Sequence, residues 1–157
     1  MEIHDVPIAQ TGMLIRRPVA EVFEAFVDPA ITSRFWFTKG GGRLEPGKRV
    51  RWDWEMYGHS VNVDVKAVER NKRIEIEWSP QDGHGPSTTV EWIFSPRAGD
   101  ATFVTVTNKG FHGDGDAIVK QALDSMSGFS FVLSGAKAVL EHDVELNLIA
   151  DRYPEGH

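Results

Sequence analysis

Residues 114–142, DGDAIVKQALDSMSGFSFVLSGAKAVLEH, decide the fold that this sequence predicts. Asp114 or Asp116 is suited to cap the N-terminus of a helix, and the helical pattern continues to about His142. At a rise of 1.5 Å per residue, such a helix is roughly 40 Å long and crosses a whole sheet. Its apolar residues recur at helical spacing and predict one buried stripe, made of Val119, Leu123, Met126, Phe129, Leu133, Ala136 and Leu140.

Short runs upstream of this helix alternate between apolar and polar residues, which is typical of strands with one wet face. Turn residues such as Pro46-Gly47 separate them, at spacings of about ten residues that favour an antiparallel meander. The predicted strands cover residues 8–16, 49–56, 61–66, 74–78, 89–95 and 102–107.

Two short helices are expected between the first strand and the meander. Pro18 suits the first turn of a helix, and Asp28-Pro29 ends it and caps a second one, over residues 29–35. Gly40-Gly41-Gly42 is interpreted as a loop. The simplest way to bury both the strands' apolar face and the helical stripe is to lay the long helix across a strongly curved sheet. The predicted fold class is therefore α+β.

Length and composition favour a single domain over residues 1–157 and exclude several classes of protein. The chain has no cysteine, so it has no disulfide framework and no thiolate site. With 17 basic and 23 acidic residues the net charge is −6, which argues against nucleic-acid binding. No apolar run approaches the roughly 20 residues of a membrane span, and the start of the chain lacks a signal-peptide pattern. We expect a cytoplasmic protein.

Several motifs together resemble a known family. The chain is similar to the SRPBCC (START/birch-pollen-allergen-like) superfamily, and within it to the subgroup related to the activator of heat-shock protein 90 ATPase. The similarity spans roughly residues 8 to 142. It rests on PVAEVFEAFVDP at 18–29, Phe35-Trp36, the Gly-Gly-x-x-x-Pro-Gly turn at 41–47, VTVTNKGF at 104–111, and Gly128-Phe129 together with KAVLE at 137–141.

The resemblance implies a helix-grip fold, in which a curved antiparallel sheet of about six or seven strands wraps around the C-terminal helix. It also implies a cavity beneath that helix. Members of the superfamily include lipid carriers, hormone-receptor-like binders, and polyketide cyclases and aromatases. Subgroup members often have His or Trp where this chain has Asn108 and Phe129, so no particular ligand is carried over.

Aromatic residues are the most informative candidates for a binding site. They fall on predicted inward faces of strands or at the rim of the implied cavity, where a subset would line an apolar pocket with a few polar groups. The ligand-binding candidates are Trp36, Trp52, Trp54, Trp78, Trp92, Phe94, Asn108, Phe111, His112, Met126, Phe129 and Leu133.

Gly128 and Phe129 receive a specific prediction. A glycine in mid-helix is explained by a bend or by a close approach of the helix backbone to the sheet. Phe129 would then project inward, toward Trp92 or Trp54.

No catalytic set, metal site or cofactor is predicted. The histidines lack the i, i+4 spacing of a helical metal site, and no serine lies in a nucleophile elbow. Asp53 and Glu55 alternate with two tryptophans; if the tryptophans face inward, the acids are solvated. The candidates for acid–base work are Asp53, Glu55, Asn108 and His112.

Three hypotheses about function follow. The first is the binding of a small apolar or amphipathic molecule without catalysis. The second is a cyclase- or aromatase-type enzyme, and the third is a chaperone-associated interaction module. A homodimer is also expected, through a free sheet edge or an exposed aromatic such as Trp36.

Overall fold

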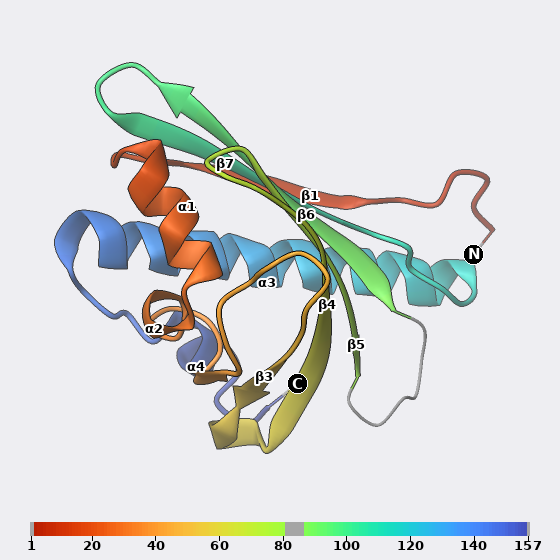
Figure 1. Cartoon of the computed structure of the whole chain (residues 1–157). Helices are drawn as coiled ribbons and strands as arrows, with labels where there is room; N and C mark the ends of the chain where they lie inside the picture. The colour runs from red at the N-terminus through yellow and green to blue at the C-terminus, as the bar shows by residue number, and fades with distance from the viewer. Residues whose placement is uncertain (1, 81–86, 157) are drawn as a thin grey trace.

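The computed structural model describes residues 2–80 and 87–156. Within them, an antiparallel sheet with the strand order β1-β7-β6-β5-β4-β3-β2 curls around the long helix α3 (Figure 1). This is the predicted helix-grip arrangement. The strands are β1 (Ala9–Ile15), β2 (Lys39–Gly40), β3 (Arg49–Trp54), β4 (His59–Glu69), β5 (Arg73–Pro80), β6 (Thr88–Arg97) and β7 (Ala101–Lys109).

The helices lie on the concave side and at one end of the sheet. α3 (Gly115–His142) runs along the sheet, and its first turns lie beside the N-terminal segment (Figure 1). The shorter helices gather where α3 ends: α1 (Val19–Val27), α2 (Pro29–Thr32) and α4 (Leu148–Arg152). α4 buries Ile149, so part of the C-terminal segment docks on the rest of the protein.

Most predicted strands are a few residues longer in the structure, and three local features differ in kind from the sequence-based expectation. β3 ends at Trp54 instead of continuing to Met56, because the 3-10 helix η1 (Glu55–Tyr57) follows and Gly58 adopts a left-handed conformation. Met56 is therefore exposed. α2 has only four residues, and the glycine-rich loop contains the short strand β2, which pairs with Trp52 and Asp53 of β3.

The caps of α3 agree with the prediction. Asp114 is the N-cap residue, and its side chain accepts a hydrogen bond of 2.8 Å from the backbone N–H of Ala117. The helix ends at His142, where Asp143 takes a left-handed conformation. The full length of the helix is thus set by local sequence signals.

The predicted apolar stripe of α3 is right only in its second half. Phe129, Leu133 and Ala136 are buried, but Leu123 is 64% exposed and Met126 is 48% exposed. In the first half, the inward face is formed by other residues, among them Ile118 and Ser125. Ile118 packs into a separate small cluster with Ala9 and Phe111.

The close approach expected at Gly128 occurs about two turns later, at Gly135. A Cβ built on Gly128 meets nothing within 4 Å. A Cβ on Gly135 would lie 3.1 Å from the Cβ of Phe35 and 3.3 Å from its carbonyl oxygen. Gly135 is therefore the glycine that lets α3 pack against the segment after α2.

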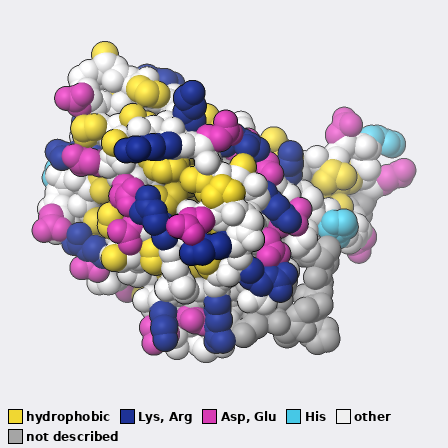
Figure 2. All heavy atoms as spheres, in the orientation of Figure 1, with side chains coloured by type: hydrophobic (Ala, Val, Ile, Leu, Met, Phe, Trp, Pro, Cys, Tyr) yellow, Lys and Arg dark blue, Asp and Glu magenta, His cyan; other side chains and the backbone are white. Residues whose placement is uncertain are grey.

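The surface carries charges of both signs. On the face seen in Figure 2, acidic and basic side chains lie next to each other over α1 and its surroundings, with apolar side chains between them. Glu24 and Arg43 form one of these pairs. Among the described residues, no helix combines the length and the apolar character that crossing a membrane requires.

Candidate functional site

The candidate site lies between the inner face of the sheet and the second half of α3. Trp36 and five further aromatic rings meet there, and the centroid of each of the five lies within 6.3 Å of the Trp36 ring centroid. The ring of Phe129 is also close to the tryptophan rings from β5 and β6. We call this set the aromatic cluster: Trp36, Trp52, Trp54, Trp78, Trp92 and Phe129.

Strand alternation places four of these rings. Successive side chains of a strand point to opposite faces, so Trp52 and Trp54 share the inner face of β3 while Asp53 lies on the outer one. Trp78 and Trp92 come from the inner faces of β5 and β6 in the same way. This alternation confirms the prediction that the tryptophans of β3 face inward.

The other two rings come from opposite sides. Phe129 descends from α3 and stacks on Trp78, with centroids 5.7 Å apart at an interplanar angle of 27°. It also meets Trp92 edge-on at 6.1 Å, as predicted. Trp36 comes from the residues between α2 and β2, outside any helix or strand, and contacts Trp52 at 4.8 Å.

Trp36 is buried, which corrects the idea that it offers an exposed surface to a partner. Only 8% of the residue is exposed, because it sits at the centre of the aromatic cluster. Phe37 next to it stacks on Trp52 at 4.7 Å. The run Phe35-Trp36-Phe37 was visible in the sequence, but Phe37 was not predicted as a site residue because neighbours in a chain rarely point to one place.

The remaining candidates divide into those near the aromatic cluster and those away from it. Leu133 lies in the same core, and Phe94 packs mainly on Phe23 and Phe26 beneath α1. Phe111 belongs to the separate cluster around Ile118. His112 and Met126 are exposed and line no part of this interior, because both lie on outward-facing positions around the first half of α3.

Asn108 faces inward, as the alternation along β7 predicts, and is 3% exposed. Its amide donates a hydrogen bond of 2.8 Å to the carbonyl oxygen of Thr89 on β6. Its oxygen accepts one of 2.8 Å from the hydroxyl of Ser125 on α3. Asn108 thus ties the first half of α3 to the sheet, and its polar atoms are engaged within the protein.

Trp92, unlike Asn108, has a buried polar atom without a hydrogen-bond partner among the described residues. The residue is 1% exposed, and its Nε1 is the buried side-chain nitrogen that lacks a hydrogen-bond partner among the described residues. The indole nitrogen of Trp78, by comparison, donates to the hydroxyl of Thr88 at 2.8 Å. A donor left unpaired in a protein interior is unusual and calls for an explanation.

The acid–base candidates do not converge. Hydrogen bonds from Ser60 and Arg51 lower the pKa of Asp53, which stays ionised on the outer face of β3. Glu55 and His112 are exposed. Among the described residues the buried polar side chains are Thr32, Thr102 and Asn108, and no three His, Asp or Glu residues are grouped for a metal ion.

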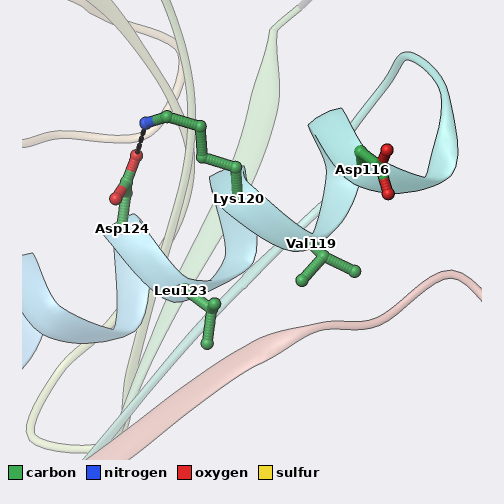
Figure 3. A pocket seen from close by; sticks show the side chains of 5 residues that line it. All are labelled: Asp116, Val119, Lys120, Leu123 and Asp124. Carbon is green, nitrogen blue, oxygen red and sulfur yellow. Dashed lines mark hydrogen bonds and ion pairs between the residues drawn. The ribbon is translucent and has the colours of Figure 1, made fainter. Parts of the chain in front are cut away.

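Side chains fill the interior, and the two most distinct hollows are shallow depressions on the surface. The first, of about 300 Å³, lies on the outer side of α3 between Val119, Leu123 and the Lys120–Asp124 ion pair (Figure 3). The second, of about 600 Å³, lies by the β6–β7 turn and the end of β1. Neither coincides with the aromatic cluster, whose rings pack against one another beneath α3, where the resemblance implies a cavity.

Residues 16–128 match the model of the family described as Activator of Hsp90 ATPase homolog 1-like protein. The chain belongs to this family. The matched residues include α1, the sheet from β2 to β7 and the first half of α3, and so most of what builds the activator-homolog fold. No curated protein matches the sequence.

Solved structures agree with this assignment to the activator-homolog family. Protein SSP2350 from Staphylococcus saprophyticus is 32% identical, with a TM-score of 0.74 over 89% of this chain and 96% of that one. The Aha1 dimer from Colwellia psychrerythraea is 16% identical, with a TM-score of 0.73 over 87% and 97%. DynU16, from the dynemicin biosynthetic locus, is 22% identical, with a TM-score of 0.74 over 90% and 49%. At the identities of the last two, the likeness concerns the fold.

Proposed function

We propose that the protein binds a small apolar or amphipathic molecule between the inner face of the sheet and the second half of α3. The observation that carries the proposal is the aromatic cluster, in which one ring, Trp36, is held by residues outside helices and strands. Aromatic faces stack on flat ligands with little loss of side-chain freedom, which makes them effective contacts for such molecules. The ligand takes the place of part of this packing.

The absence of converging proton-transfer groups among the described residues favours binding over the cyclase or aromatase alternative. Such catalysis needs an acid or base within hydrogen-bond reach of the substrate. Asp53, Glu55 and His112 lie on the outside, and the amide of Asn108 is already hydrogen-bonded. DynU16 comes from a biosynthetic locus, but its likeness to this chain supports the fold and no reaction.

A thermal-shift screen tests the binding proposal. The screen covers fatty acids, polyphenols and aromatic polyketides, each against the unaltered protein. A ligand present at 100 times its Kd stabilises the folded state by about 2.7 kcal/mol and raises Tm by roughly 5–10 °C. Val144→Ala is the control, since Val144 is exposed and lies outside the aromatic cluster, so its loss should leave the shift unchanged. The absence of a shift with every apolar class contradicts the proposal.

We propose a homodimer on separate grounds. The Aha1 protein from Colwellia psychrerythraea is described as a dimer, and Leu123 and Met126 expose apolar surface on the first half of α3. Sedimentation of the protein across micromolar concentrations tests this. A dimer mass that Leu123→Asp lowers to a monomer mass supports it, and a monomer mass throughout refutes it.

A further inference from the structure

The unpaired N–H of Trp92 is the starting point. Its indole lies on the inner face of β6, with the rings of Phe26, Trp36 and Phe129 at centroid distances of 6.1, 5.9 and 6.1 Å. These rings offer an N–H group at most a weak contact with their π faces. A buried donor without an acceptor raises the free energy of the folded state, so an acceptor brought into this space would be favoured.

Trp36 is the ring best placed to make room for it. It contacts Trp92, Phe129 and four further aromatic residues, so its departure would expose the centre of the aromatic cluster. Its backbone is outside regular structure, between the end of α2 at Thr32 and the start of β2 at Lys39. Moving it breaks the hydrogen bonds from the Trp36 N–H to Thr32 and from the Thr38 N–H to Asp53, but none of the bonds between the strands β3 to β7 or within α3. The space that it vacates has the size and flatness of a bicyclic ring.

The surroundings also limit the charge of what enters. Among the described residues the aromatic cluster contains no ionisable side chain, and the fully buried polar residues are Thr32, Thr102 and Asn108. A charged group here would lose its hydration without gaining a partner of opposite charge. The acceptor must therefore be neutral, as a ketone or quinone oxygen is.

We propose that the ligand is a neutral, flat aromatic compound of at least two fused rings that takes the place of the Trp36 ring and whose carbonyl oxygen accepts a hydrogen bond from Trp92 Nε1–H. This inference rests on the proposed binding function and names the chemistry of its ligand. It assigns Trp92 the role of the polar anchor and Trp36 that of the displaceable ring. Asn108 has neither role, because its amide is engaged with Thr89 and Ser125.

Two probes of matched shape test the anchor: 2-acetylnaphthalene, which carries the carbonyl, and 2-ethylnaphthalene, which lacks it. Trp92→Phe keeps an aromatic ring and removes the donor, so we expect the Kd of the ketone to rise about tenfold, the loss of one hydrogen bond, and that of the hydrocarbon to stay within about twofold. Trp78→Phe is the matched control. The indole nitrogen of Trp78 already has Thr88 as its partner, so the two probes should change by the same factor.

The indole N–H signals in the NMR spectrum give a second readout. The ligand response is measured on the unaltered protein, so it does not depend on a substitution. The chain has five tryptophans, and the signal missing in Trp92→Phe identifies Trp92. We expect this signal to move downfield with the ketone and not with the hydrocarbon. A Trp92 signal that responds equally to both probes overturns the anchor.

The outcomes separate this inference from the function on which it rests. If both probes bind but Trp92→Phe weakens them equally, the anchor is wrong and the binding function stands. If neither probe binds the unaltered protein while another apolar ligand does, the proposed ligand class is wrong. If no apolar ligand binds at all, the binding function itself fails.

A last variant tests the displacement. Trp36→Ala removes the ring that must leave, so both probes should bind this variant more tightly than the unaltered protein, by about tenfold if the open state is about one-tenth populated. Val144→Ala, outside the site, should not change either Kd. Equal or weaker binding of both probes by Trp36→Ala shows that the ligand does not take the place of this ring.

Discussion

The two halves of α3 carry similar side chains but hold the protein together in different ways. In the second half, Phe129 and Leu133 enter the core beneath the sheet. In the first half, Leu123 and Met126 face outward, and the links to the sheet are a small cluster around Ile118 and the hydrogen bond between Ser125 and Asn108. The comparison shows that an apolar stripe is buried only where a facing apolar surface exists.

Hydrogen bonds at the edge of the sheet also distinguish the second half of α3 from the first. β1 runs beside the second half of α3, where Lys137 donates to the carbonyl oxygen of Leu14 and Glu141 accepts from the backbone N–H of Arg16, each at 2.8 Å. These bonds occupy backbone groups of a strand at the edge of the sheet. The second half of α3 therefore covers that edge, which would otherwise remain open to pairing.

The largest difference between the halves should appear when one apolar side chain is truncated in each. Phe129→Ala should lower the free energy of unfolding by about 3–5 kcal/mol, because it removes a buried ring that three tryptophans contact. Leu123→Ala should change it by no more than about 0.5 kcal/mol, because Leu123 is exposed. Urea unfolding measures both. Similar losses in the two variants would contradict the helix register described here.

Asn108 tests whether the first half is held by polar contacts. Asn108→Ala removes the donor to Thr89 and the acceptor for Ser125, so the free energy of unfolding should fall by about 1–3 kcal/mol. Ser125→Ala should cost less, about 1 kcal/mol, since the bond from Asn108 to Thr89 remains. Urea unfolding again measures the loss, and hydrogen exchange of residues 116–127 locates it. A loss spread evenly over α3 would argue against a local tie.

Sequence patterns were enough to predict six of the seven strands, though not β2, as well as the N-cap and the end of α3 and the inward direction of the tryptophans. Each of these depends on local chemistry, such as the side chain of Asp114 at the helix start or the alternation along β3. The family followed from the same residues. The sequence did not reveal which face α3 buries in its first half, because Ile118 and Leu123 both belong to apolar stripes with helical spacing. Only the facing residues, among them Asn108, decide between them.

The packing inside the site is a second feature that sequence patterns could not predict. Alternation indicates which way Trp52, Trp78 and Trp92 point, but not whether the space between them is open or filled. That depends on Trp36, whose position is set by a segment without periodicity. The unpaired nitrogen of Trp92 is likewise a property of packing that no spacing in the sequence could reveal.

The two glycines in the interior of α3, Gly128 and Gly135, sharpen the comparison because substitutions there should change stability in opposite directions. Gly128→Ala should raise the free energy of unfolding by up to about 1 kcal/mol, because a Cβ there meets open space and alanine favours the helix. Gly135→Ala should lower it by roughly 1 kcal/mol net, because overpacking of about 1–3 kcal/mol against Phe35 outweighs the same helical gain. Thermal unfolding of the two variants decides this. A stabilised Gly135→Ala variant would show that Phe35 yields without cost.

The smallest effect concerns two ion pairs of the same spacing, one in each half of α3. Lys120–Asp124 is exposed, whereas the Glu141 carboxylate of Lys137–Glu141 is mostly buried and also accepts from Arg16. Burial works to raise the pKa of Glu141, but the Arg16 N–H and the Lys137 ammonium outweigh it and lower that pKa below its usual range.

A carboxyl group whose pKa is lowered on folding stabilises the protein above its unfolded pKa of about 4.3, and this contribution is lost as the pH falls through the folded value. Glu141→Gln should therefore destabilise the protein at pH 7 by about 1 kcal/mol, and the difference from the unaltered protein should shrink steadily below about pH 4.3. Asp124→Asn is the matched control and should show little difference at any pH, since exposed pairs contribute little. Urea midpoints between pH 3 and pH 7 give both curves. A Glu141→Gln difference that stays constant over this range would mean that the carboxylate's shape, not its charge, secures the end of α3 to β1.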